Sequence, residues 1–360
     1  MERAAVRNEA TLRTFIEAFS TVHLHLAVPD LLWPDTQYKA AAELSLPALL
    51  QLLCKGRVQI TQARDIDTWL LEAFGVPGAG AANYSLRADG GNPGDEYWLR
   101  ADPCHLQVNR DRVILADSQT FQIDRNEAEA MVESLNALFA TDGMRFYPLQ
   151  PDRWYMRLSG DTPIETTSLA QVRGKDIDPL LPRGPQAMQW RRMLNEAQML
   201  LHAHPVNESR EARGAAPINS IWLWGEGASP TPPRKFQRVR TQNALAAGLA
   251  QAAGASVHPV PADAAQWLKA PEGEGIELVV LESLSGPACY GDLHAWQSAL
   301  QRLEETWFAP LLEALRKGRL GLLSLHCLGA AAAFSIEISR QDLRYFWRRQ
   351  KALQHYADPA

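Results

Sequence analysis

Residues 185–228, PQAMQWRRMLNEAQMLLHAHPVNESREARGAAPINSIWLWGEGA, decide the fold. Their first part is amphipathic, because apolar residues recur every three or four positions between Trp190 and Leu201. That period predicts a helix with one buried stripe. Pro205 lacks a backbone donor and restricts the residue before it, so the helix is expected to end there.

The second part of the stretch predicts a turn and a strand. Asn207 is placed to cap a short turn that closes at Gly214. Ser220–Trp224 is short and apolar, as is typical of a buried strand. Gly225 and Gly227 then predict a tight loop. The stretch is therefore expected to supply a helix, a polar turn and a central strand of the core.

Residues 204–227 resemble the archaeal-type cofactor-independent phosphoglycerate mutases of the alkaline-phosphatase superfamily. The positions that fall on the pattern of that family are Asn207, Arg210, Gly214, Pro217, Asn219, Trp222, Trp224, Gly225 and Gly227. The resemblance implies a three-layer α/β core of alkaline-phosphatase type with a mainly parallel sheet. It also implies a small α+β cap, which gives a core over residues 1–90 and 166–360 and an inserted cap over 91–165.

The order of the predicted elements supports the same fold class. Strands alternate with helices along the chain, which favours a parallel sheet covered by helices. In such folds ligands gather at the carboxyl ends of the strands. Those ends are expected at Asp30, residues 225–227, residues 282–289 and His326.

The resemblance shows which residue stands at the position of the family's nucleophile. Residues 77–86 read PGAGAANYSL, and in the mutases this place resembles Pro-Gly-Ser-Asp-Val-Ala-Asn-Leu-Ser-Leu. The register then puts the nucleophilic serine on Ala79 and the following aspartate on Gly80. A methyl group cannot accept a phosphoryl group.

The metal ligands implied by the resemblance are also replaced. The superfamily uses two divalent cations, which need several carboxylates and histidines. The same register puts an aspartate ligand on Ser285, a histidine ligand on Cys289, and the aspartate of an Asp-His pair on Leu325. Asp30 and His326 keep ligand-type side chains.

A mononuclear site remains as an alternative. Asp30, Cys289 and His326 could hold one divalent ion, zinc or manganese, with the thiol favouring zinc. The competing interpretation is that these are three unrelated core or loop residues. His23 and His25 lie two positions apart on one predicted strand, so their side chains share a face. They could form a pair of metal ligands, or they could simply pack against neighbouring residues.

The first functional hypothesis is a non-catalytic relative of the mutases, similar to the bacterial branch labelled Rpf-type regulatory proteins. Such a protein would bind a small molecule or a protein partner and need no cofactor. Asn207, Arg210 and Asn219 are the candidate contacts for an anion or ligand; alternatively they hold the turn between helix and strand. The second hypothesis is an active phosphoglycerate mutase or phosphatase-type enzyme with rearranged metal ligands.

The overall composition limits the classes of partner that the chain is expected to bind. The chain has 360 residues, a formal charge of −5 and 46% hydrophobic residues, as expected of an ordinary globular protein. A net negative charge does not favour nucleic acid or anionic membranes. Four widely spaced cysteines and no secretory segment indicate a cytoplasmic protein. The tail after 339 interleaves arginines with aromatics, which suggests nucleic-acid binding or a helix burying Leu343, Phe346 and Trp347.

Overall fold

The computed structural model describes residues 22–35, 40–41, 43–160, 164–269, 275–329, 332–345 and 347–356. Backbone contacts divide the chain into two compact units. Unit 1 comprises residues 1–64, 235–242 and 255–360, and unit 2 comprises residues 65–234 and 243–254. The predicted cap boundaries at 91 and 165 both fall inside unit 2. A helix expected over residues 2–19 lies outside the described residues.

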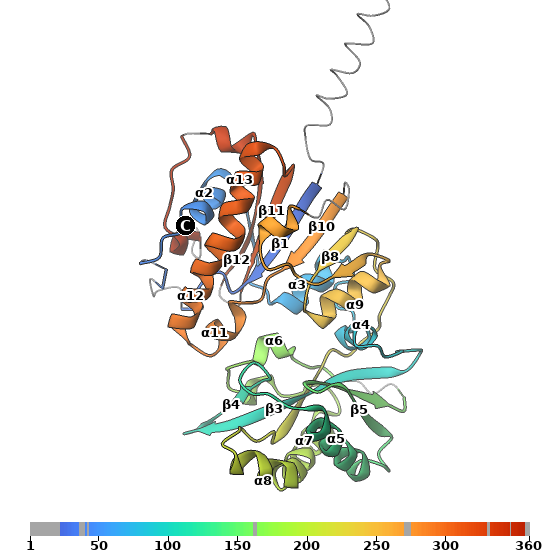
Figure 1. Cartoon of the computed structure of the whole chain (residues 1–360). Helices are drawn as coiled ribbons and strands as arrows, with labels where there is room; N and C mark the ends of the chain where they lie inside the picture. Colours follow the sequence, from blue (N-terminus) through green and yellow to red (C-terminus); the bar gives the residue numbers. More distant parts are fainter. Residues whose placement is uncertain are drawn as a thin grey trace, which may run out of the picture. The chain divides into compact units, whose positions relative to one another are not determined.

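Unit 1 is built on a seven-stranded sheet (Figure 1) in the order β2-β12-β11-β1-β10-β8-β9. Its strands are β1 (Val22–Pro29), β2 (Arg57–Thr61), β8 (Arg238–Arg240), β9 (Ser256–His258), β10 (Gly275–Val280), β11 (Leu322–Leu328) and β12 (Ala333–Ser339). β1 lies in parallel between β10 and β11, and β8 and β9 continue the parallel part. β12 and β2 add antiparallel pairings at one edge. The predicted α/β class with a mainly parallel central sheet is confirmed.

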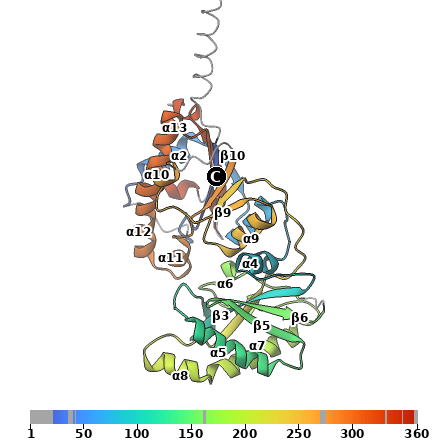
Figure 2. The same ribbon diagram turned by 45° about the vertical axis from the view of Figure 1, so that its right-hand side comes forward.

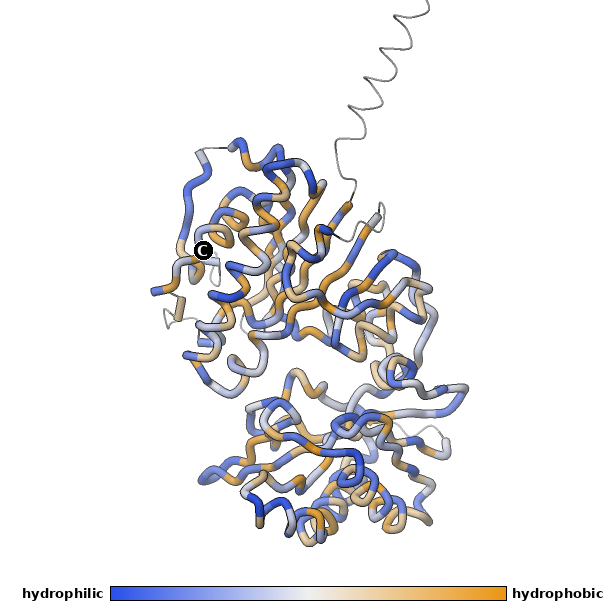
Figure 3. Tube along the Cα trace, viewed as in Figure 1, coloured by the Kyte–Doolittle hydropathy of each residue, from blue (hydrophilic) through white to orange (hydrophobic). Residues whose placement is uncertain are grey.

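Helices cover one face of this sheet. The helical segments of unit 1 are α2 (Pro47–Lys55), α10 (Ala264–Trp267), α11 (Ser285–Cys289), α12 (Leu293–Leu303), a π-helical turn (Glu304–Phe308), α13 (Ala309–Lys317) and the 3-10 turns Asp342–Arg344 and Leu353–Tyr356. Leu24 and Leu26 of β1, together with Leu323 and Leu325 of β11, are fully buried in the core that these helices form. Figure 3 shows hydrophobic residues along these strands and at intervals along the helices. Alternation therefore places His23, His25 and His326 on the opposite face.

A long helical segment covers residues 293–317 in three consecutive parts. α12 ends at Leu303, and α13 begins at Ala309 with Pro310 in its first turn. Between them lies the π-helical turn, in which buried Glu304 accepts hydrogen bonds from the backbone amides of Ala48 and Leu49 at 2.5 and 2.9 Å. The carboxylate thus satisfies donors in the first turn of α2, which has no side-chain cap of its own.

Unit 2 is an antiparallel sheet with helices. Its strands are β3 (Tyr97–Asn109), β4 (Arg112–Ala116), β5 (Met144–Gln150), β6 (Arg153–Leu158) and β7 (Ser220–Trp224), and its helices are α3 (Ile66–Ala73), α4 (Ala81–Ala88), α5 (Arg125–Leu138), α6 (Leu169–Val172), the 3-10 turn Asp178–Leu180, α7 (Ala187–His202), α8 (Pro205–Ala212) and α9 (Ala244–Ala252). The strand order is β4-β3-β6-β5, with β7 also paired to β3. α5 and α7 lie along one face of this sheet (Figure 2) and share its main hydrophobic core.

The expected place of Ser220–Trp224 is wrong. β7 pairs antiparallel with residues 100–104 of β3 in unit 2 and is not a strand of the parallel core sheet. Its residues are buried on both faces, because Ile221 and Leu223 enter the core beneath α7 while Trp222 and Trp224 lie opposite. Residues 225–227 therefore follow a strand of the unit 2 sheet and do not follow a strand of the parallel sheet.

Two local predictions are also corrected. Among the described residues after 339, helical structure is limited to the 3-10 turns Asp342–Arg344 and Leu353–Tyr356, and Trp347 is 62% exposed, so it is not buried by a helix as expected. Residue 346 lies outside the described part. α8 begins at Pro205 with His204 as N-cap, so Asn207 lies inside the helix and does not cap it. Pro205 fits because the first helical position needs no backbone donor.

No helix among the described residues is both long enough and apolar enough to cross a membrane.

Candidate functional site

The loop that carries Ala79 is packed by its backbone against the loop after β7. Gly80 donates its amide to the carbonyl of Ala228 at 2.7 Å, and Ala82 donates to Gly225 at 2.9 Å. A Cβ atom at Gly80 would lie 2.3 Å from the carbonyl oxygen of Gly227. The position that the mutase register gives to the nucleophile thus holds a half-buried methyl group, and the next position has no room for a side chain.

Two of the three predicted ligand contacts, Asn207 and Asn219, use their side-chain amides to hydrogen-bond to backbone groups. The side-chain amide of Asn207 donates to the carbonyls of Leu201 and Ile218 at 2.7 and 2.9 Å, and its oxygen accepts from the Ile218 amide at 2.8 Å. Asn219 pairs with Leu106 in the same way, accepting at 2.7 Å and donating at 3.0 Å. These contacts join α8 to the end of α7 and to the segment just before β7, and they join that segment to β3, which favours the structural alternative for both residues.

The third contact, Arg210, is fully buried and makes three different bonds. Its Nε donates to the Ala216 carbonyl at 2.8 Å, and one terminal nitrogen donates to the Gln122 carbonyl at 2.8 Å. The other terminal nitrogen lies 2.6 Å from the Glu127 carboxylate. Arg213 bonds to the second oxygen of Glu127. Two guanidinium groups therefore share one carboxylate.

The predicted metal residues come from three different segments of unit 1. Asp30 follows β1 in a left-handed conformation (φ 56°), with its backbone bonded to Leu328 and to the indole of Trp296. Cys289 ends the short helix α11. The ring nitrogens of His326 face His25 and Ser335, each at 2.9 Å.

The residues present do not fit the two cations that the fold family implies. Across the described ranges, no group of three or more His, Cys, Asp or Glu side chains could hold a metal ion, so Asp30, Cys289 and His326 are not assembled into a site. Leu325 is fully buried in the hydrophobic core. The Ser285 hydroxyl is buried without a hydrogen-bond partner among these residues. Hard divalent ions require oxygen-rich ligand sets. At the three positions where the resemblance implies ligands, this chain has the aliphatic Leu325, the hydroxyl of Ser285 and the thiol of Cys289.

A cluster of three histidines was only partly anticipated by the alternation of His23 and His25. His326 of the neighbouring strand joins them, because β1 and β11 are parallel and in register. The rings of His25 and His326 are stacked with centroids 5.1 Å apart, and Nε2 of His23 contacts the Ser324 hydroxyl at 2.8 Å. Burial lowers the pKa of His25 to about 2, with His326 and His23 adding to the effect. Burial likewise lowers the pKa of His326 to about 3, helped by Lys235 and His23.

These pKa values predict acid sensitivity. His25 and His326 are neutral in the folded protein, whereas in the unfolded chain they protonate below about 6.5. The unfolded state then binds more protons, so the free energy of unfolding is highest above pH 6.5 and falls as the pH drops toward 3. Between pH 7.5 and 5.5 each histidine should remove about 1.4 kcal/mol. Urea unfolding at the two pH values measures this loss.

The matched variants separate the cluster from general acid effects. His25→Asn should reduce the pH-dependent loss by about 1.4 kcal/mol, since one buried titrating group is gone. His294→Asn, which changes an exposed histidine of α12, should leave the loss unchanged. An equal loss in wild type and His25→Asn would contradict the assignment.

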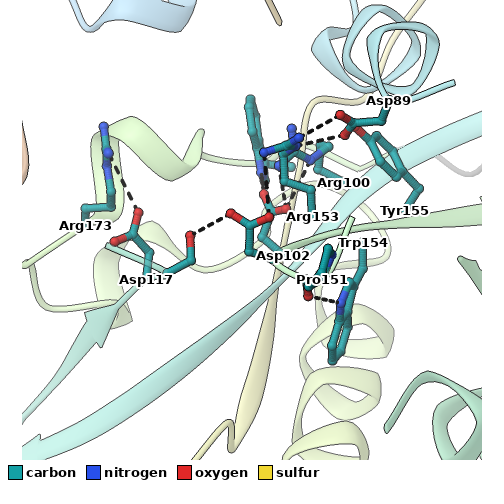
Figure 4. Close-up of polar contacts among 12 residues, drawn as sticks. Asp89, Arg100, Asp102, Asp117, Pro151, Arg153, Trp154, Tyr155 and Arg173 are labelled. Carbon is teal, nitrogen blue, oxygen red and sulfur yellow. Dashed lines mark hydrogen bonds and ion pairs between the residues drawn. The ribbon is translucent and has the colours of Figure 1, made fainter. Parts of the chain in front are cut away.

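A second polar network lies on the face of the unit 2 sheet away from α5 and α7 (Figure 4). Arg100 of β3 donates twice to one oxygen of Asp102, at 3.1 and 2.6 Å, and the indole of Trp224 donates to the other oxygen at 2.6 Å. The guanidinium carbon of Arg100 lies 5.2 Å from the ring centroids of both Tyr155 and Trp224. Burial opposes charge on Arg100, but the Asp102 carboxylate keeps the pKa of the guanidinium above its ordinary range.

The same network continues to the end of α4. Asp89 accepts both a bidentate pair of bonds from Arg153, at 2.9 and 2.8 Å, and the Tyr155 hydroxyl at 2.6 Å. Burial raises the pKa of Tyr155 well above its ordinary value, so the phenol stays protonated and acts as a donor. Each charge in this network has a partner of opposite sign. Only the alternation of β3 hinted at it in the sequence, by placing Arg100 and Asp102 on one face.

Comparisons with known proteins agree with this fold. The family model for 2,3-bisphosphoglycerate-independent phosphoglycerate mutase matches residues 93–207. A protein of that name from Methanosarcina mazei is 31% identical over 129 residues, which cover 35% of this chain and 32% of the relative. Another from Methanothrix thermoacetophila is 30% identical over 221 residues, 57% of this chain and 56% of the relative. The matched segments thus span about a third to just over half of these relatives.

Two solved structures share the architecture over most of the chain. The cofactor-independent phosphoglycerate mutase of Thermoplasma acidophilum aligns with a TM-score of 0.50 and 16% identity, covering 95% of both chains. A Pyrococcus horikoshii protein aligns with a TM-score of 0.52 and 14% identity, over 89% of this chain and 88% of its own. The chain therefore has the alkaline-phosphatase-like fold of the cofactor-independent phosphoglycerate mutases, and it resembles these enzymes in sequence, with the family model matching residues 93–207.

Proposed function

We propose that this protein is a non-catalytic relative of the phosphoglycerate mutases with a regulatory role, exerted by binding a small molecule or a protein partner. One observation carries the proposal. The mutase register places the nucleophile on Ala79 and its neighbouring acid on Gly80, where a side chain would collide with the Gly227 carbonyl. Without a nucleophile no phosphoryl-enzyme can form at this loop.

The chemistry of the other register positions supports the same proposal. Ser285, Cys289 and Leu325 stand where the resemblance calls for an aspartate, a histidine and an aspartate. A two-metal mechanism needs both ions to hold the attacking and leaving oxygens, and these side chains are poor ligands for manganese or magnesium. We also place the protein in the cytoplasm, since all four cysteines are free thiols.

Metal retention tests the proposal. We expect the full chain, after incubation with Mn²⁺ or Zn²⁺ and removal of excess ion, to retain well below one equivalent of either. Elemental analysis gives the stoichiometry. Retention of about two equivalents would contradict the proposal and favour an active mutase or phosphatase-type enzyme with rearranged ligands. Retention of one zinc ion that is lost in Cys289→Ser would support the mononuclear alternative instead.

A further inference from the structure

A pocket of about 530 Å³ lies in unit 2 between the start of α5 and the segment after α8. It is lined by residues 120–124, 127, 210 and 213–216. Its lining includes a charged cluster made of Arg210, Arg213 and Glu127, in which both arginines bond to the one carboxylate. All of these residues belong to one compact unit, so the pocket is defined by a single body.

The cluster has an excess of positive charge. Two guanidinium ions face one carboxylate, and the side chains of Arg210 and Glu127 are 1% and 10% exposed. Arg210 is buried and paired with Glu127, and the second positive charge belongs to the partly exposed Arg213, so an anion entering the pocket would balance that second charge. Asp124 also lines the pocket, but it is exposed, and one of its oxygens caps α5 by accepting from the Glu127 amide.

The guanidinium groups have donors left for such an anion. Arg210 uses three of its five N–H groups, on the Ala216 and Gln122 carbonyls and on Glu127, which leaves one on each terminal nitrogen. These bonds fix the plane of the group before any ligand arrives, so little side-chain entropy is lost on binding. Arg213 is 53% exposed and bonds to Glu127 through one nitrogen, so it can close over an entering group.

We propose that this pocket binds the oxyanion group of a small ligand, a carboxylate or a phosphate, held between Arg210 and Arg213. Planar guanidinium forks match both groups through paired N–H donors. Phe121 and residues 214–216 are among the other lining residues, and a volume of about 530 Å³ leaves room for an organic body attached to the anion. The inference rests on the proposed ligand-binding function and names the site and the ligand class for it.

The test is titration of the full chain with sodium phosphate and, separately, with sodium citrate, by calorimetry at low ionic strength. We expect saturable binding of at least one anion, and the arm that binds assigns phosphate or carboxylate as the recognised group. Arg213→Ala should weaken the affinity at least tenfold, and Arg213→Lys should weaken it less, because charge remains but the fork is lost.

The matched control is Arg192→Ala. Arg192 is an exposed arginine of the same unit, paired with Glu196 on the surface of α7, and its loss should leave the affinity unchanged. Thermal unfolding of each variant verifies that it is folded. Absence of saturable binding of either anion, or an equal loss in Arg213→Ala and Arg192→Ala, would overturn the proposal. Mutase turnover by the wild-type chain would end the proposed function but would not alter this result.

Discussion

Gly80→Asp is expected to destabilise the protein by about 3 kcal/mol or more and to create no mutase activity. Aspartate is the residue that the mutase pattern places there, yet a Cβ at Gly80 would lie 2.3 Å from the oxygen and 2.7 Å from the carbon of the Gly227 carbonyl. Both partners are backbone atoms held by the bond from Gly80 to Ala228, so neither can move aside cheaply. Urea unfolding measures the loss.

Ala79→Ser is the matched control for this loop. It adds one hydroxyl to a half-buried neighbour of Gly80 and should change the free energy of unfolding by less than about 1 kcal/mol. Neither this variant nor Ala79→Ser/Gly80→Asp should turn over 3-phosphoglycerate. Wild-type stability in Gly80→Asp would refute the packing argument, and activity of the double variant would show that the loop can still form a mutase site.

Gly248→Ala should destabilise unit 2 by more than about 3 kcal/mol, although the same change inside an ordinary helix stabilises by about 1 kcal/mol. Gly248 lies in the middle of α9, where α9 crosses α4. A Cβ there would meet the carbonyl oxygen of Tyr84 at 1.8 Å and its carbon at 2.3 Å. The two helices would have to move apart, which would open the contact between them.

The control for this prediction is Ala247→Gly, one position earlier in α9. That change should cost only the ordinary helix propensity of about 1 kcal/mol. Stabilisation of the protein by Gly248→Ala would mean that propensity decides this helix and that the close approach to Tyr84 is not maintained.

Local patterns predicted most of the elements of this chain. The apolar spacing from Trp190 to Leu201 corresponds to the buried residues of α7, and the alternation around His23 corresponds to β1. Both signals depend on neighbours within one or two turns, which the sequence contains. The position of Pro310 in the first turn of α13 was predictable for the same reason, since proline acts on its own turn.

Pairing partners were much harder to predict. Ser220–Trp224 is buried on both faces, so its composition suits a strand in a parallel core equally well. What places it in unit 2 is its antiparallel register with residues 100–104, which lie more than a hundred positions earlier. The residues of β3 were expected as two short strands, 96–99 and 106–108, whereas they form one strand that includes Arg100 and Asp102. Their charges are satisfied only by partners such as Trp224 from that distant strand.

The candidate site shows the same limit. Asn207, Arg210 and Asn219 were predicted either to contact a ligand or to hold the turn, and their partners at Ile218, Glu127 and Leu106 come from three different segments. Position along the chain could not distinguish a ligand contact from a structural clamp. The sequence was informative where the argument needs only the residue type. The side chain of Ala79 has no nucleophilic group, whatever the fold around it.

Turnover of 3-phosphoglycerate by the purified wild-type chain, with Mn²⁺ or Zn²⁺ present, tests the central claim most directly. The Methanosarcina mazei protein named as a mutase provides the positive control. We expect conversion indistinguishable from the protein-free blank, because no residue of the 77–80 loop can accept the phosphoryl group. Metal-dependent turnover that a chelator abolishes would contradict the non-catalytic assignment.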